Sequence, residues 1–209
     1  MRQADNIREV ERLGVDWMGF IFFPPSSRYV DSKPSYLPER AKRVGVFVDA
    51  DMNFMVSRAS EFGLDLIQLH GHEAPSVCER LKELCPNIEI IKAFGIGGEQ
   101  ALPPTADYEG LADYLLFDTA TKLAGGSGKT FDHSLLDAYS GTTPFLLSGG
   151  LSLDNQPQTM AFSHPMLAGY DLNSRFETQP AVKDARLLQQ YLNNLRRLPS
   201  DQRDDNGNH

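Results

Sequence analysis

Residues 44–69 read VGVFVDADMNFMVSRASEFGLDLIQL, and this stretch decides the fold class. It opens with the apolar run Val44–Val48 and closes with the apolar run Leu66–Leu69. Between them, Asn53–Phe62 places charged and apolar residues at helical spacing. Runs that are apolar nearly throughout are typical of strands buried on both faces, as in a parallel sheet. The stretch therefore predicts two parallel strands joined by a helix.

The same unit recurs along the chain. Apolar runs of this kind occur at Trp17–Phe22, Val44–Val48, Leu66–Leu69, Ile88–Phe94, Tyr114–Phe117, Pro144–Leu147 and Gly169–Leu172. Helical patterns follow at Asn53–Phe62, Pro75–Leu84, Ser134–Tyr139 and Val182–Leu195, with a weaker pattern around Gly98–Ala112. The chain itself begins with a helical pattern, Asp5–Leu13, in which Ile7, Val10 and Leu13 share one stripe.

A closed barrel of this class has eight strands, each followed by a helix. Here the chain begins with a helical pattern and shows seven strands, so the missing strand would precede the first helix. We therefore predict an α/β fold of the (β/α)8 (TIM) barrel type, with its first strand missing from this chain. An open seven-stranded sheet explains the count equally well. We expect a single domain over residues 1–198 and a polar, disordered tail over 199–209.

The composition narrows the classes of partner. The 209 residues are 41% hydrophobic with a net charge of −8, which fits one sizeable core and argues against nucleic acid and anionic membranes. A small anionic substrate is compatible, because backbone N–H groups can hold it. With neither a membrane-length apolar stretch nor a signal-peptide core, we expect a cytoplasmic protein. Cys78 and Cys85 are expected to be buried or half-buried thiols rather than a disulfide or metal pair.

In parallel barrels the active site lies at the carboxyl ends of the strands. The polar residues found there are Arg28, His70, Asp118, Ser148 with Gly149 and Gly150, and Asn173 with Ser174. Asp118 directly follows Tyr114–Phe117, and partial burial at this rim favours the protonated carboxyl that a general acid needs. A strand-end aspartate that only caps or forms an ion pair is an equally good interpretation.

Two glycine-rich loops are candidates for holding an anion. Ser148–Ser152 (SGGLS) ends a strand and is expected to open a helix, so that its backbone can approach a phosphate; an ordinary tight turn is the alternative. Gly125–Thr130 (GGSGKT) is not a P-loop, because Leu123 stands where that motif needs glycine. We expect this loop to cover the mouth of the site, with Lys129 near the anion.

Arg28 and the two histidines have more than one interpretation. Arg28 follows a strand and stands beside an aromatic residue, so it is suited to clamping a carboxylate; a solvated loop arginine is the alternative. His70 and His72 would share one face of a strand, but no third metal ligand is evident. We therefore predict no metal.

These residues, in this order, resemble phosphoribosylanthranilate isomerase, the isomerase of tryptophan biosynthesis. The similarity extends from about Ala4 to Leu195, through GFIFFPPSSRYV, RVGVFVDA, IQLHGHE, IIKAFGI, LLFDT with GGSGKTFDHSLL, LLSGGL and GYDLNSRFETQPAVKDARLL. The resemblance implies a (β/α)8 barrel that uses neither metal nor cofactor. It also implies an Amadori rearrangement of N-(5'-phosphoribosyl)anthranilate into a 1-deoxyribulose phosphate. By position it makes Asp118 the general acid, and it assigns substrate binding to Arg28, His70, Gly149, Gly150, Asp171, Asn173 and Ser174.

This chain departs from the family pattern at two places. Many members carry Ser-Ser-Gly where this chain has Asn173-Ser174-Arg175, which affects backbone approach to the phosphate. The family also begins with a strand ending in Cys-Gly, whose cysteine is the general base, and Met1-Arg2 aligns just after that pair. Cys78 and Cys85, in a later helix, cannot replace that base.

The second departure leads to the expectation of impaired turnover in this chain, and of self-association through exposed strand edges. The alternatives are a related histidine-pathway isomerase or a non-catalytic phosphate-binding relic. The first is disfavoured because Lys92–Gly95 lacks the required carboxylate.

Overall fold

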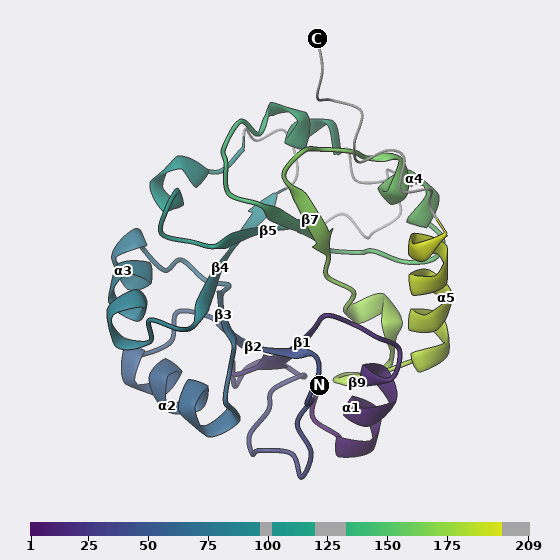
Figure 1. Ribbon diagram of the computed structural model, residues 1–209, viewed down its shortest axis with the longest axis horizontal. Helices are drawn as coiled ribbons and strands as arrows, with labels where there is room; N and C mark the ends of the chain where they lie inside the picture. Colours follow the sequence, from purple (N-terminus) through teal and green to yellow (C-terminus); the bar gives the residue numbers. More distant parts are fainter. Residues whose placement is uncertain (97–101, 120–132, 198–209) are drawn as a thin grey trace.

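Seven parallel strands form the wall of a barrel in the computed structural model, which describes residues 1–96, 102–119 and 133–197. The strands are β1 Trp17–Ile21, β2 Lys42–Phe47, β3 Leu66–Leu69, β4 Glu89–Ile96, β5 Tyr114–Thr119, β6 Phe145–Ser148 and β7 Leu167–Tyr170. Each strand pairs with the next one along the chain, so the sheet runs in the order β1 to β7. Figure 1 shows the strands around the centre and the helices outside them. The seven predicted strands are confirmed, with ends shifted by a few residues.

The helices form the outer layer of the molecule (Figure 1). They are α1 Ala4–Glu11, α2 Met52–Phe62, α3 Pro75–Leu84, α4 Gln156–Ala161 and α5 Ala185–Arg196, with short 3-10 turns η1 Thr105–Tyr108, η2 His133–Ala138 and η3 Ser174–Phe176. The Asp51 carboxylate caps α2 by accepting hydrogen bonds from the N–H groups of Asn53 and Phe54, and Gly63 ends that helix at φ 57°.

Two of the expected helices differ from the structure. The segment expected as a helix at Ser134–Tyr139 corresponds to the 3-10 turn η2, which ends at Ala138, rather than to an α-helix. The last helix begins at Ala185, because Val182–Lys183 forms a strand, β9, paired antiparallel with β8, Glu177–Gln179. The carboxylate of Asp184 then caps α5. The weak pattern at Gly98–Ala112 corresponds only to η1 within the described residues, and the tail at 199–209 lies outside them.

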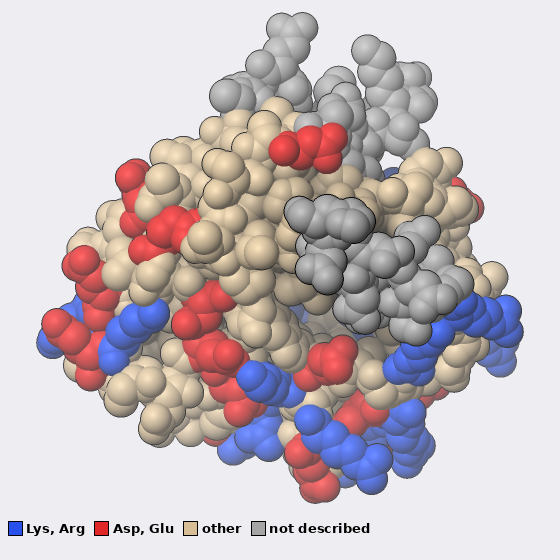
Figure 2. Space-filling model, turned by 45° about the horizontal axis from the view of Figure 1, so that its top comes forward, with Lys and Arg blue, Asp and Glu red and all other residues tan. Residues whose placement is uncertain are grey.

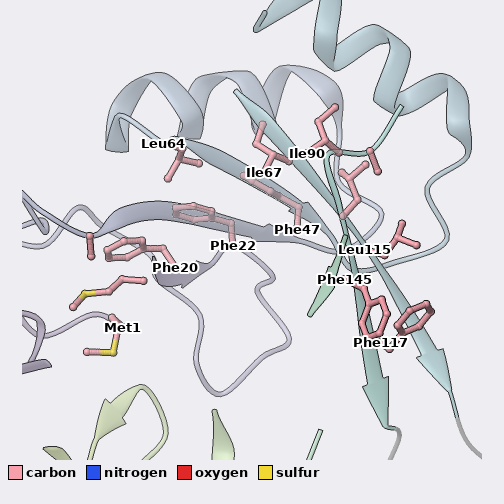
Figure 3. Close-up of a cluster of buried hydrophobic side chains, with 14 of the residues drawn as sticks. Met1, Phe20, Phe22, Phe47, Leu64, Ile67, Ile90, Leu115, Phe117 and Phe145 are labelled. Atoms are coloured by element: carbon pink, nitrogen blue, oxygen red, sulfur yellow. The ribbon is translucent and has the colours of Figure 1, made fainter. Parts of the chain in front are cut away.

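Both faces of the central strands β3 and β6 are buried. On the outer face, a large apolar cluster fills the space between sheet and helices; Figure 3 shows part of it, including Phe20, Phe47 and Ile67. On the inner face, a second apolar cluster consists of Val44, Leu66, Ile91, Ala93, Leu116 and Leu146, and several of its members line the space inside the barrel. All four residues of β3 are buried as a result. Each fully buried leucine or isoleucine stabilises the fold by about 1.5–3 kcal/mol, and this burial explains the unbroken apolar runs.

The sheet has two free edges, at β1 and β7, within the described residues. We call the space between these edges the seam. Along the β1 edge of the seam, the terminal amino group of Met1 donates a hydrogen bond of 2.7 Å to the Gly19 carbonyl. Burial, together with the positive charge of Lys183, lowers the pKa of that amine to about 5. The seam is therefore filled in part by the first residue of the chain.

On the face shown in Figure 2, acidic and basic groups lie close together at the left and lower centre, and basic groups predominate at the right. None of the helices in the described ranges has the length and apolar character that crossing a membrane requires.

Candidate active site

A cavity of about 680 Å³ lies inside the barrel and reaches the carboxyl ends of the strands. Its polar lining comes from several elements: Arg28 after β1, Gln68 and His70 in and after β3, Asp118 in β5, Ser148 at the end of β6, and Asp171 with Asn173 after β7. The predicted residues Arg28, His70, Asp118, Asp171 and Asn173 are thus brought together around one space. Gly149, Gly150 and Ser174, also predicted, do not line it.

Asp118 faces the cavity from a central position in the sheet. Its backbone lies between Gly95 of β4 and Ser148 of β6 in the strand register. Its side chain is 34% exposed, and its Oδ2 lies 3.3 Å from Nε2 of His70. The carboxyl group therefore has a defined orientation and still reaches a ligand in the cavity.

Gln68 is a functional candidate that the sequence interpretation missed. It is a single polar residue within the buried strand β3, and its side-chain Nε2 lies 2.6 Å from Nδ1 of His70. Three side chains, Gln68, His70 and Asp118, thus form a chain of hydrogen bonds across the strand ends. The signal available in the sequence was the glutamine that interrupts the run Leu66–Leu69.

Arg28 is held by a carboxylate that the sequence interpretation also missed. Its Nε and Nη2 donate to Glu177 over distances of 2.7–3.1 Å, and the side chain of Glu177 is only 4% exposed. Lys183 donates to the same carboxylate at 3.3 Å and to Oδ1 of Asn173 at 2.7 Å. Burial opposes the ionisation of Glu177, but the hydrogen bonds from Arg28 and the charge of Lys183 outweigh it, so its pKa lies below the ordinary value. Arg28 is therefore fixed in orientation rather than solvated.

The glycine loop after β6 is a turn, not the start of a helix. Gly149 and Gly150 have φ values of 85° and 64°, which glycine adopts without strain. The side chain of Asn155 then accepts from Ser152 N and donates to the Gly150 carbonyl, which closes the loop. The helix α4 begins only at Gln156, so the expectation of a helix opening within Ser148–Ser152 is wrong. The loop Gly125–Thr130 with Lys129 lies outside the described residues.

The strand end after β7 is built around Asp171 and Asn173. Oδ2 of Asp171 accepts a hydrogen bond of 3.0 Å from the Ser148 hydroxyl, which ties the ends of β6 and β7 together. Ser174 and Arg175 are exposed and belong to the turn η3. Ser148, Asp171 and Asn173 are among the side chains of this edge that line the cavity.

The two cysteines of the sequence lie away from the cavity, on or next to the outer helix α3. Cys78 is buried, and burial raises the pKa of its thiol to about 11; Cys85 is half-buried. The expectation of buried or half-buried thiols is confirmed. Within the ranges described, no three His, Cys, Asp or Glu side chains are placed to hold a metal ion.

Parallel strands in sequential order, helices outside them, and polar side chains gathered at the carboxyl ends define a (β/α)-barrel enzyme. Comparisons with known proteins identify which one. The family model of N-(5'-phosphoribosyl)anthranilate isomerase matches residues 1–194. The isomerase of that name from Phocaeicola vulgatus is 50% identical over 196 residues, which cover 94% of this chain and 95% of the relative.

Solved structures agree with this assignment. The phosphoribosylanthranilate isomerase of Thermotoga maritima is 29% identical, with a TM-score of 0.75 over 94% of this chain and 95% of that chain. A second isomerase structure, in complex with reduced 1-(o-carboxyphenylamino)-1-deoxyribulose 5-phosphate, is 26% identical with a TM-score of 0.72 over 94% and 98% of the two chains. The chain therefore belongs to the N-(5'-phosphoribosyl)anthranilate isomerase family, the isomerases of tryptophan biosynthesis.

Proposed function

We propose that the cavity carries out the Amadori rearrangement of N-(5'-phosphoribosyl)anthranilate with Asp118 as general acid. The observation that supports this role is the position of Asp118: it lies next to the carboxyl end of a central strand, lines the cavity and keeps 34% of its side chain exposed. Asp118 gives its proton to the ribose ring oxygen as the bond from that oxygen to C1 breaks. The lone pair of the anthranilate nitrogen forms the C=N bond of a Schiff base. A base then removes the proton from C2, and the enolamine tautomerises to the ketone.

We propose that the two anionic ends of the substrate are held on opposite parts of the cavity rim. Arg28, with its Nε side anchored by Glu177, presents the rest of its guanidinium group to the anthranilate carboxylate. The backbone of Gly149 and Gly150, with Asn173 and Ser174, receives the phosphate, while Asp171 supports that rim by accepting from Ser148. His70 lines the pocket between these two ends.

We propose that residues 1–209 alone give only trace turnover, because neither of their cysteines is suited to act as the base. Cys78 and Cys85 lie away from the cavity lining, and the thiol of Cys78 has a pKa of about 11, so neither is suited to remove the C2 proton. A strand joined ahead of Met1 that brings a cysteine opposite Asp118 is expected to restore turnover. A general base contributes about 10²–10⁴-fold.

The test combines binding with turnover. Residues 1–209 are titrated with the reduced product analogue named above, and turnover is measured beside the extended chain. Binding with turnover at least about 100-fold below that of the extended chain supports the proposal. Equal turnover contradicts the assignment of the base, and absence of binding favours a non-catalytic relic.

The acid is tested in the extended chain. Asp118→Asn removes the transferable proton and keeps the shape of the side chain, so kcat is expected to fall by about 10²–10⁴-fold. Asp137→Asn, on an exposed aspartate of η2, is the matched control and should leave kcat unchanged. An Asp118→Asn variant with native kcat would exclude Asp118 as the acid.

A further inference from the structure

Gln68 is a buried polar side chain in an otherwise apolar strand, and the reaction steps above do not use it. Its neighbours in β3, Leu66, Ile67 and Leu69, are fully buried, and Gln68 itself is 6% exposed. An amide in such a position costs free energy unless it is hydrogen-bonded. Its Nε2 makes that bond with Nδ1 of His70 at 2.6 Å.

The direction of this bond determines which nitrogen of His70 carries the proton. An amide NH2 group can only donate, so Nδ1 of His70 must be the acceptor and carry no proton. A neutral imidazole then has its proton on Nε2. Nε2 lies 3.3 Å from Oδ2 of Asp118, so a proton on Nε2 is within hydrogen-bonding reach of that oxygen.

We propose that Gln68 is a positioning residue that keeps His70 in the neutral Nε2–H form and thereby selects the oxygen of Asp118 that acts as the acid. Oδ2 accepts from His70, so the proton passed to the ribose ring oxygen lies on Oδ1. Once that proton has left, the bond from Nε2–H stabilises the remaining carboxylate. This inference rests on the proposed role of Asp118 in the reaction.

The form of His70 can be measured without any turnover. Long-range ¹H–¹⁵N spectra of the ligand-free chain distinguish Nε2–H from Nδ1–H imidazole, and His70→Asn identifies the signals of His70. We expect Nε2–H in the native chain. Gln68→Met keeps the length of the side chain but removes the donor, so both forms should appear. Gln68→Glu offers only an acceptor when ionised, so it should shift the proton to Nδ1.

Gln156 provides the matched control for these variants. It is a buried glutamine in α4 that donates to the Tyr191 carbonyl, and Gln156→Met should leave the His70 signals unchanged. A proton on Nδ1 in the native chain would overturn the proposal, because the amide oxygen of Gln68 would then face the ring. His70 signals that are the same in the native chain, Gln68→Met and Gln68→Glu would also overturn it.

Measurements of turnover distinguish a failure of this inference from a failure of the proposed function. In the extended chain, Gln68→Met should lower kcat by about two- to tenfold, the value of one hydrogen bond, with KM unchanged. If Asp118→Asn keeps native kcat, the acid role fails while the form of His70 still stands. If Asp118→Asn loses activity and Gln68→Met does not, the acid role stands and the positioning role of Gln68 fails.

Discussion

Glu177 shows at the scale of one residue how a buried charge is tolerated. Its carboxylate receives hydrogen bonds from Arg28, from Lys183 and from the backbone N–H of Ala181. Two cations and one amide thus surround a single anion that is nearly inaccessible to water. A buried charge that loses its partner is far more costly than a surface charge. The group therefore couples the stability of the fold to the orientation of Arg28.

Replacing Glu177 should destabilise the protein in a pH-dependent way. Glu177→Gln leaves the positive charges of Arg28 and Lys183 without their anion, which should lower the free energy of unfolding by about 3–5 kcal/mol at pH 7. The pKa of Glu177 is lower in the folded chain than its ordinary value of 4.5, so its contribution is present above that value. The contribution is lost as the pH falls through the lower folded-state pKa. Urea unfolding at several pH values measures the difference between the two chains.

Glu83 supplies the control for this experiment. It forms an ion pair with Arg80 on α3, and both side chains are more than half exposed. Glu83→Gln should therefore change the free energy of unfolding by less than about 1 kcal/mol. If the effect of Glu177→Gln remained constant from neutral to strongly acid pH, the stabilising carboxylate would have to be a different one.

Asn6 joins two elements from opposite ends of the chain. Its Nδ2 donates to the Lys183 carbonyl at 2.9 Å, and its Oδ1 accepts from the Lys183 N–H at 2.8 Å. The Asn6 side chain, in α1, thus hydrogen-bonds to the backbone of β9 in the way that a neighbouring strand would. Arg196 of α5 adds hydrogen bonds to the carbonyls of Leu13 and Gly14. We call these contacts between the first and last elements the clasp.

The clasp should contribute measurably to stability. Asn6→Ala leaves the backbone N–H and C=O of Lys183 without their partners in a half-buried position, which should cost about 1–3 kcal/mol. Thermal or urea unfolding measures this loss. Asn53→Ala, on the exposed face of α2, is the control and should have an effect within about 0.5 kcal/mol. Equal losses in the two variants would contradict the role of the clasp.

The elements that the sequence predicted are those whose signal is local. Each strand is a short, mostly apolar run, and each long helix has one apolar stripe, so Leu66–Leu69 and Asn53–Phe62 were recognised directly. The hairpin of β8 and β9 was missed because Val182 and Lys183 continue the periodicity of α5. Its β9 strand is hydrogen-bonded by Asn6, which is 177 residues away from Lys183. A distant partner leaves no periodic signal.

The residues of the site could likewise be predicted where their signal is local and were missed where their role depends on a distant partner. Asp118, His70 and Arg28 could be predicted because each follows an apolar run that ends at one edge of the sheet. Glu177 could not, because its role depends on Arg28, 149 residues earlier in the chain. Gln68 was hidden for a different reason: a glutamine within a strand is unremarkable until its contact with His70 is seen.

At the scale of the whole molecule, the seam leaves strand edges that can pair with other chains. β1 and β7 each have a single strand neighbour among the described residues. Unpaired edges promote association between molecules, and lysine on an edge strand opposes it. We therefore expect residues 1–209 to self-associate as the concentration rises, as measured by light scattering after size-exclusion chromatography.

Ala168→Lys is the variant that tests this expectation, because Ala168 is an exposed residue of β7. It should reduce self-association, whereas Ala138→Lys, on the exposed part of η2, adds the same charge away from the seam and should not. Equal association in both variants would exclude the β7 edge as the contact. A strand joined ahead of Met1 should also raise the thermal midpoint, and an unchanged midpoint would show that the seam costs little stability.

The clasp also has a mechanical consequence. Six strand interfaces hold the ring together through backbone hydrogen bonds, whereas the first and last elements meet through a few side-chain contacts. A force applied between residues 1 and 197 loads the hydrogen bond from Met1 to Gly19 and these side-chain contacts before it loads the pairs of strands. The ring should therefore yield at low load near Asn6 and Arg196, before any strand separates. The molecule would therefore lengthen in two stages, first as the side-chain contacts of the clasp break and then as the strands separate.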